Sequence, residues 1–460
     1  MEGESEVIEP FELHHSDLLL LSSPSSSPSG PGEIEWLESV SRAVMKALGP
    51  SGPGLLAITG VERALELRRS LLSLSRRLAL LDNDDRRRVL KDHGLGTDVS
   101  LKNPDRSVSS FVLHLNYLED SILDLTSDGS SHEFEENGSA REGALHTDAF
   151  HELQYCEFKK LGSNFKDLGI CMMRLGLRLA QVCDKAIGGQ VLEKSILDSG
   201  SAKGRLIHYH SALDASVLRA RGNKKETKSK EQQKLLRHFS SENSGIGVMR
   251  SLKPSQLDLW QQWHYDYGIF TVLTTPMFTC PCQKSTFEEN SCSCMLCVQE
   301  YSPPGGHTYL QLFDANTDKI LVVKTPPASF IVQVGESADI LSKGKLRSTL
   351  HSVYKPMGLE NVSRDTFVLF LQPAWNKTFS ISDYPPTAST ESSEKSISTE
   401  EMSEAISTDS VDKESHRLGQ EIHRMIPPLF SRLKDGMTFA EFSRETTKQY
   451  YGGSGTQSVR

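Results

Sequence analysis

The sequence predicts an α+β fold in which a helical N-terminal part precedes an antiparallel β-barrel or β-sandwich. Two observations support this prediction. Apolar residues recur at helical spacing through the first part of the chain, and from Gly204 onward they alternate with a period of two. Helices followed by strands are typical of α+β proteins. The chain has 460 residues, 37% of them hydrophobic, so it can also bury a sizeable core.

Three stretches in the first part carry an apolar face at helical spacing. They predict a helix at residues 33–48, a second at residues 61–81, and one or two further helices at residues 150–187. Between the first two, the apolar run GLLAITGV at residues 54–61 is bounded by glycines and predicts a buried strand. A further helical pattern at residues 420–451 predicts a C-terminal helix that packs on the barrel, with a partner-binding helix as the alternative.

The later part of the chain carries the period of two. The predicted strands are residues 205–210, 263–275, 308–313, 319–324, 330–334, 345–354 and 366–372. Three polar segments interrupt the pattern, at residues 124–147, 219–237 and 383–414. Each has too little apolar surface to offset the entropy of ordering it, so we expect all three to be mobile.

Composition excludes several classes of protein. The net charge of −9, from 51 basic and 60 acidic residues, argues against a general nucleic-acid binder. No apolar run approaches the roughly 18 residues of a membrane span, and the N-terminus is acidic where a secretory signal would be basic. We therefore expect a monomeric cytoplasmic protein. The basic insert at 219–247 leaves a nuclear location as an alternative.

One set of residues predicts a metal site. In an extended strand residues i and i+2 share a face, so His264 and Asp266 point the same way, and His351 from a neighbouring strand would complete the set. Two imidazoles and one carboxylate leave three positions open on an octahedral Fe(II). The His-x-Asp pattern also occurs at residues 15–17 and 146–148, but only His264 opens a β-rich, aromatic segment.

Three ordered motifs resemble the plant 2-oxoglutarate and Fe(II)-dependent dioxygenases of the isopenicillin N synthase-like class. WHYDYGIFTVLTTPMF, from Trp263, resembles the metal-binding strand of that family. VGESADILSKGKLRSTLHSV, from Val334, resembles its second signature, in which a Gly-acid turn, an Ile-Leu-Ser strand at residues 340–342 and a hairpin lead to the distal histidine, here His351. Arg364-Asp365-Thr366 is similar to its Arg-x-Ser motif, with Thr in place of Ser.

The resemblance implies a double-stranded β-helix (jelly-roll) core, with 2-oxoglutarate as co-substrate, O2 as oxidant and a small-molecule substrate. It implies that Arg364 and Thr366 hold the distal carboxylate of 2-oxoglutarate. The strand RLIHYH, from Arg205, resembles one in which the family often has Asn-Tyr-Tyr. Tyr209 or His210 could therefore contact the keto-acid end, and ordinary strand residues are an equal alternative for both.

With this resemblance the chain divides into five parts. They are an N-terminal strand and flexible loop (1–32), a helical region with a disordered loop at 124–147 (33–203), a jelly-roll core with a basic insert at 219–247 and a Cys-rich insert at 278–305 (204–375), an acidic Ser/Thr-rich linker (376–415) and a C-terminal helical segment (416–460). The linker or the Cys-rich insert could bind a protein partner.

The Cys-rich insert carries five of the eight cysteines of the chain. They are Cys280, Cys282, Cys292, Cys294 and Cys297. Thiolates so spaced could close around Zn²⁺, with His307 as an extra ligand, although the spacing matches no common zinc finger. The alternative is a reduced, exposed loop or a redox-labile pair such as Cys280 and Cys282.

Two other functions compete with an oxygenase of small molecules. A catalytically silent member of the family could serve as a scaffold, although the intact triad with Arg364 argues against this. A JmjC-like protein or nucleic-acid hydroxylase would typically use a lysine for the 2-oxoglutarate carboxylate, and Arg364 argues against that class as well.

Overall fold

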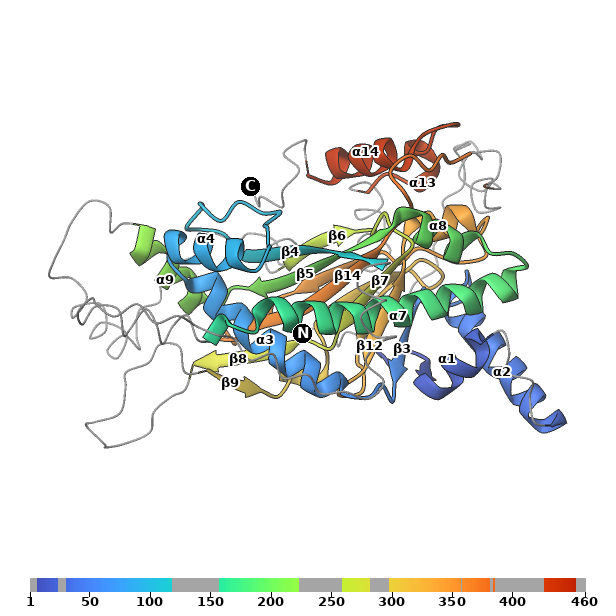
Figure 1. Ribbon diagram of the computed structural model, residues 1–460, viewed down its shortest axis with the longest axis horizontal. Helices are drawn as coiled ribbons and strands as arrows, with labels where there is room; N and C mark the ends of the chain where they lie inside the picture. The colour runs from blue at the N-terminus through green and yellow to red at the C-terminus, as the bar shows by residue number, and fades with distance from the viewer. Residues whose placement is uncertain are drawn as a thin grey trace, which may run out of the picture.

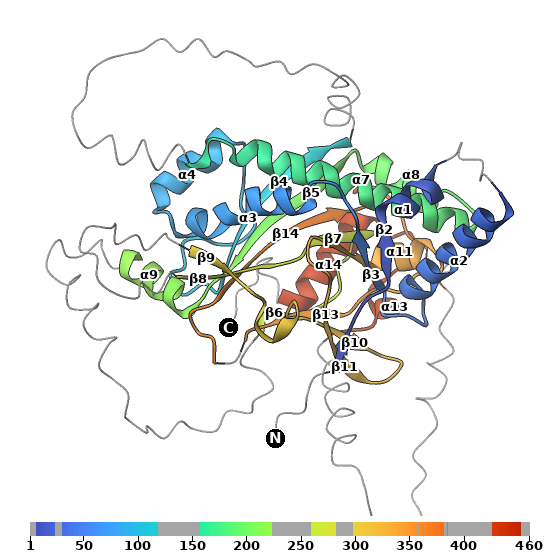
Figure 2. The ribbon, with the colours of Figure 1, turned by 90° about the horizontal axis from the view of Figure 1, so that it is seen from below.

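The computed structural model describes residues 6–23, 30–117, 157–222, 259–281, 298–356, 358–380, 384 and 426–451. These residues form a mixed α/β fold with two β-sheets (Figure 1). Figure 2 shows helices over one side of the larger sheet and the smaller sheet on its other side. The molecule is therefore layered as helices, larger sheet and smaller sheet.

The described strands divide between the two sheets. The smaller sheet has the order β1 (Glu6–Ile8), β11 (Lys319–Val323), β10 (Leu310–Asp314), β13 (His351–Tyr354) and β6 (Leu259–His264). The larger sheet has the order β2 (Glu12–His14), β3 (Leu55–Thr59), β12 (Phe330–Val334), β7 (Phe270–Thr274), β14 (Ser363–Leu371), β5 (Ser201–Tyr209) and β4 (Val108–Asn116), with β8 (Met277–Pro281) beside β14 and β9 (Val298–Tyr301) beside β8. Neighbouring strands are antiparallel except in the pairs β1–β11 and β2–β3.

Most described helices precede the strands that bear the site. They are α1 (His15–Ser22), α2 (Pro31–Leu48), α3 (Ala64–Leu80), α4 (Asn83–Asp92), α7 (Leu161–Ile187), α8 (Val191–Ser199), α9 (Ala212–Gly222), α11 (Glu336–Leu341), α13 (Leu429–Arg432) and α14 (Phe439–Tyr451), with a 3-10 turn at Pro304–Gly306. None of these helices is both long enough and apolar enough to cross a bilayer.

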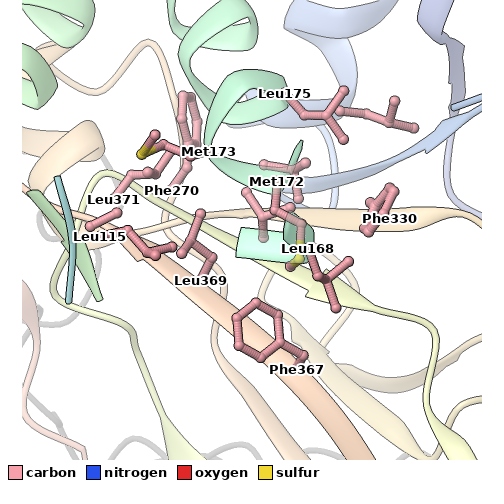
Figure 3. Packing of buried hydrophobic residues seen from close by; sticks show 14 of the residues in the cluster. Leu115, Leu168, Met172, Met173, Leu175, Phe270, Phe330, Phe367, Leu369 and Leu371 are labelled. Atoms are coloured by element: carbon pink, nitrogen blue, oxygen red, sulfur yellow. The ribbon is translucent and has the colours of Figure 1, made fainter. Parts of the chain in front are cut away.

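Helix α7 lies against the larger sheet because glycines bring it close. Buried side chains of α7 such as Leu168 and Met172 pack on Phe367 (Figure 3). A Cβ on Gly176 would lie 2.2 Å from a methyl carbon of Leu371. Gly169, two turns earlier, meets the sheet in the same way, so two small residues on one face set the distance between helix and sheet.

A second core lies between the two sheets. Leu310 and Val353 of the smaller sheet belong to one buried cluster with Leu273 and Val368 of the larger sheet. Polar side chains share these faces with them, such as Arg364 and Thr366 on the face of β14 that carries Val368, so the facing surfaces of the sheets are partly apolar and partly polar. The candidate site occupies this interior.

The C-terminal segment packs on the loop beside the smaller sheet. Phe439 and Phe442 of α14 are buried in a cluster with Ile340, and Tyr267 packs against it. Arg432, at the end of α13, is ion-paired with Glu336, and both side chains are buried. Within the described residues, the C-terminal helix therefore docks on the body of the protein.

Most predicted elements have a counterpart in the structure. Residues 33–48 and 61–81 correspond to α2 and α3, the described part of 150–187 contains α7, and 54–61 corresponds to β3. Predicted strands 205–210, 308–313, 319–324, 330–334 and 366–372 correspond to β5, β10, β11, β12 and β14. The loop at 124–147, most of both inserts and most of the linker lie outside the described residues. Strand β4 joins the larger sheet although the sequence pattern did not predict it.

The prediction of one strand at residues 263–275 is wrong. The segment contains the end of β6 and all of β7, which belong to different sheets. The chain crosses between the sheets at residues 265–269, where Gly335 N donates to Ile269 O and Glu336 N donates to Asp266 O. The backbone of the crossing is thus satisfied by another loop instead of by a strand partner.

Two further strand predictions need correction. Only His351–Tyr354 of the predicted strand 345–354 pairs as a strand, because earlier amides bond elsewhere: Arg347 N donates to Leu48 O and Thr349 N to Val334 O. The Ile-Leu-Ser strand implied by the resemblance is instead the end of helix α11 and its cap. The helix begins after Gly335, whose carbonyl accepts from the amide of Asp339.

Candidate metal centre and its cavity

Two histidines face each other across neighbouring strands of the smaller sheet. His264 ends β6 and His351 begins β13, and the two residues are direct partners in the antiparallel register. Their ring centroids are 4.2 Å apart. Because paired residues of adjacent strands project to the same side, both imidazoles enter the space between the sheets.

The hydrogen bonds of the two rings fix which nitrogen is free. His264 Nδ1 lies 2.8 Å from the carbonyl oxygen of Gln262, and His351 Nδ1 lies 3.0 Å from that of Thr349. A carbonyl only accepts, so each Nδ1 carries the proton and donates. Each Nε2 therefore has a free lone pair. Burial, with His351 as the next cause, lowers the pKa of His264 to about 4, which keeps this ring neutral near pH 7.

Asp266 completes the group from the crossing between the sheets. Its Oδ1 is 3.7 Å from His264 Nε2 and its Oδ2 is 3.7 Å from His351 Nε2. Its Oδ2 also accepts from the Thr271 hydroxyl at 2.6 Å, which holds the carboxylate in place. One ligand atom from each of the three residues lies within 4.8 Å of the others. Metal bonds of about 2.1 Å at right angles place ligand atoms about 3 Å apart, so a small contraction would suffice.

Sequence periodicity placed Asp266 on the same strand face as His264, but the structure places it differently. Strand β6 ends at His264, and Asp266 lies in the crossing that follows. The three residues nevertheless converge, because the crossing turns the carboxylate back towards β6 and β13.

Arg364, Thr366 and Tyr209 line the same cavity as the triad. Arg364 and Thr366 occupy one face of β14, and Tyr209 is the register partner of Arg364 on β5. The Arg364 guanidinium carbon is 5.4 Å from the centroid of the Tyr209 ring, and its Nε donates to Thr308 O at 3.2 Å. Burial lowers the pKa of Arg364 to about 10, so the side chain remains a cation at neutral pH.

His210, the alternative to Tyr209, does not reach the cavity. The alternation of β5 turns it to the opposite face of the sheet, where its Nε2 is 2.9 Å from the Ser109 hydroxyl. Its ring packs edge-on against His208 at 4.7 Å between centroids. Tyr209 is therefore the member of this pair that could contact a ligand.

Behind the cavity lies a second group of metal-ligating residue types, namely His208, His210 and Asp214. His208 is fully buried, with Nδ1 2.6 Å from Asp365 and Nε2 3.3 Å from Asp214. Asp214 also takes an ion pair from Arg76 at 2.8 Å. Burial alone would lower the pKa of His208, but the two carboxylates outweigh it and raise this pKa to about 9.

A proton accounts for the second group better than a metal ion. Two aspartates, Arg76 and protonated His208 sum to zero charge, whereas a divalent cation with neutral His208 would leave a buried excess of one positive charge. Moreover, Asp214 Oδ2 already accepts from the amide and hydroxyl of Ser211. This group is a buried ionic network directly behind Arg364.

The cavity itself measures about 200 Å³ and opens between the sheets. Sequence reasoning missed several residues that line it. They include Asp98, Lys203, Arg205, Phe370, Gln372 and Thr446. The alternation Lys203, Arg205, Ile207, Tyr209 on one strand face was the available signal for two of them, once Tyr209 had been singled out.

The Cys-rich insert falls largely outside the described residues. Cys280 is a free, half-buried thiol on β8, whereas Cys282, Cys292, Cys294 and Cys297 are not described. His307, the extra candidate ligand, lies 3.2 Å from the Tyr354 hydroxyl through Nε2. The zinc hypothesis stays a prediction.

No protein-family model and no curated protein matches the chain. Several solved structures are similar to it. A full-length Neurospora crassa protein, in complex with alpha-KG and 5-formyluracil, has a TM-score of 0.44 and 14% identity over 84% of this chain and 92% of that one. JOX2, in complex with 2OG, Fe and JA, has a TM-score of 0.43 and 14% identity over 82% and 78%. A dioxygenase for auxin oxidation from rice has a TM-score of 0.41 and 16% identity over 82% and 85%.

Proposed function

We propose that this chain is a non-haem Fe(II)/2-oxoglutarate-dependent oxygenase with a jelly-roll core of the isopenicillin N synthase-like type. The convergence of two free Nε2 lone pairs and a carboxylate in a cavity that also holds a buried arginine supports this proposal. Two imidazoles and one carboxylate suit Fe(II) and leave open positions for further ligands.

The residues around the triad fit an iron ion and a keto acid. Each histidine donates Nδ1–H to a backbone carbonyl, the outer hydrogen bond that orients metal-binding imidazoles. Arg364 offers a planar fork for a carboxylate in the same cavity, and Thr366 stands beside it with a hydroxyl. Bound there, Fe(II) with 2-oxoglutarate and O2 would supply the oxidation of a substrate C–H bond, with succinate and CO2 as co-products.

The contributions of the protein are binding, orientation and exclusion of water. His264, His351 and Asp266 would hold the metal, and Thr271 fixes the rotamer of Asp266 by its hydrogen bond. Arg364 and Tyr209 would bind the co-substrate in the same cavity. Apolar side chains between the sheets, among them Leu273 and Val368 of the larger sheet, would limit the access of water to the bound metal.

Conversion of 2-oxoglutarate to succinate in the absence of a second substrate tests the proposal. The protein supplied with Fe(II), 2-oxoglutarate and air should form succinate slowly, and His264→Ala or Asp266→Ala should reduce the rate at least about a hundredfold, because each removes a metal ligand. The matched control is His93→Ala, outside the cavity, which should retain the rate. Equal rates in the wild-type protein and both ligand variants would refute the assignment.

A further inference from the structure

Two cations of β5 and one anion from the segment before β4 line the cavity that holds the triad. Lys203 Nζ and Arg205 Nε, both from β5, lie 2.9 Å and 3.0 Å from Asp98 Oδ2. All three side chains line the cavity and keep a fraction of their surface exposed, between 17% and 27%. They are therefore accessible to a bound molecule.

These two cations are separate from the arginine assigned to the co-substrate. Arg364 pairs with Tyr209 in the register of β14 and β5, and Arg205 precedes Tyr209 by four residues on β5. Four residues of strand span about 13 Å. Arg205 nevertheless lines the same cavity as His264, Asp266 and His351. A molecule bound by Arg205 would thus lie beside the triad without displacing one bound by Arg364.

The charges of the three residues do not cancel. Burial alone would raise the pKa of Asp98, but Arg205 and Lys203 outweigh it and hold this pKa below its usual value, so Asp98 is ionised. One carboxylate between two cations leaves one positive charge in excess. A ligand with a single negative charge would neutralise it, whereas a phosphate dianion would overcompensate and a neutral ligand would leave the charge uncompensated.

The geometry of Arg205 also favours a carboxylate. Its Nε donates to the Ser110 hydroxyl at 3.1 Å, while its terminal amino groups donate no hydrogen bond to the part of the chain that the structure describes. The guanidinium carbon is 5.9 Å from the ring centroid of Phe370. The ring and Leu273 supply an apolar wall next to the free donors.

We propose that the primary substrate is a small organic monocarboxylic acid, bound by Arg205 and Lys203 through its carboxylate and by the Phe370 wall through its apolar body. This inference rests on the proposed oxygenase function. It identifies the substrate by a single negative charge and an apolar body.

The experiment measures stimulation of succinate formation by a panel of aliphatic and aromatic monocarboxylic acids, each paired with its primary amide, such as phenylacetate with phenylacetamide and octanoate with octanamide. We expect at least one acid to stimulate and its amide not to. Stimulation by an amide as strongly as by its acid, or by no acid of the panel, overturns the inference. If the protein forms no succinate even without a panel compound, the proposed function itself fails.

Three variants, each assayed with the acid that stimulates most strongly, test the roles of these residues in substrate binding. Arg205→Met should raise its KM about tenfold or more through loss of a charged hydrogen-bond donor. Asp98→Asn should lower its KM, since the excess charge rises from one to two, and this variant serves if Arg205→Met does not fold. Lys324→Met, which removes an exposed cation paired with Glu9, is the control and should change nothing. A purely structural role of Arg205 would reduce succinate formation without any added acid as much as with it, and this result would refute its assignment.

Discussion

At the scale of single residues, the face of a strand decides which side chains can act. Tyr209 enters the cavity and His210 does not, although the two are neighbours and both are plausible ligand contacts by type. The resemblance to the family motifs predicted His264, His351 and Arg364 as site residues. Two histidines followed by an arginine are uncommon in this order and in these motifs unless they form such a site. The resemblance could not orient β5, because alternation does not reveal which face a cavity occupies.

The buried network around His208 makes a prediction about pH. Its pKa is raised to about 9 in the folded protein, from 6.5 for an ordinary histidine. A raised pKa contributes stability that is fully present below about pH 6.5 and lost as pH rises through about 9. The contribution is on the order of 3 kcal/mol, because each pKa unit corresponds to about 1.4 kcal/mol.

Denaturant unfolding as a function of pH measures this contribution. The wild-type free energy of unfolding should fall between about pH 6.5 and pH 9, and His208→Gln should remove most of that slope while destabilising the protein at low pH. His93→Gln, outside the network, should keep the slope. A slope that persists unchanged in His208→Gln would show that the ring is not protonated between Asp365 and Asp214.

At the scale of elements, the crossing between β6 and β7 positions the carboxylate of the triad. Period-two patterning predicted a single strand there, since the apolar residues continue on both sides of the crossing. The crossing depends on a contact distant in sequence: Gly335 lies so close that a Cβ on it would be 2.3 Å from Gly268 O and 3.0 Å from Asp266 O. Such a contact leaves no local signal in the sequence apart from the two glycines.

Gly335→Ala should therefore disturb the triad. Backbone oxygens cannot move aside as a side-chain tip can, so we expect a loss of about 1–3 kcal/mol in the free energy of unfolding and weaker Fe(II) binding. Gly32→Ala, in α2, adds a Cβ that meets no atom within 4 Å and is the matched control. Thermal melts and metal titrations of both variants check the prediction, and unchanged Fe(II) affinity in Gly335→Ala would contradict it.

At the scale of the whole molecule, the C-terminal segment packs on the part of the protein that forms the site. Thr446 of α14 lines the cavity, and Arg432 pairs with buried Glu336, which begins the helix next to Gly335. The helical pattern at 420–451 predicted docking, but it could not identify the surface, because the partners of Arg432 and Phe439 come from distant segments. Contacts between residues so far apart in the sequence cannot be predicted from one sequence.

A double-mutant cycle measures how much the Arg432–Glu336 ion pair contributes to the free energy of unfolding. Arg432→Met should cost about 3 kcal/mol because it leaves a buried carboxylate unpaired, and Glu336→Gln in the same chain should recover part of the loss. Arg63→Met, which breaks an exposed pair with Glu66, should leave the free energy of unfolding nearly unchanged. Additive losses in the Arg432 and Glu336 variants would contradict direct pairing.

The most direct test of the account is an anaerobic titration of the protein with 2-oxoglutarate in the presence of Fe(II), followed by calorimetry. The wild-type protein should bind one equivalent of 2-oxoglutarate. Asp266→Ala should lose this binding through loss of the metal, and Arg364→Leu should weaken it about tenfold or more through loss of the carboxylate fork. No binding of 2-oxoglutarate by the wild-type protein, with Fe(II) present and the chain folded, would contradict the oxygenase assignment and favour a scaffold.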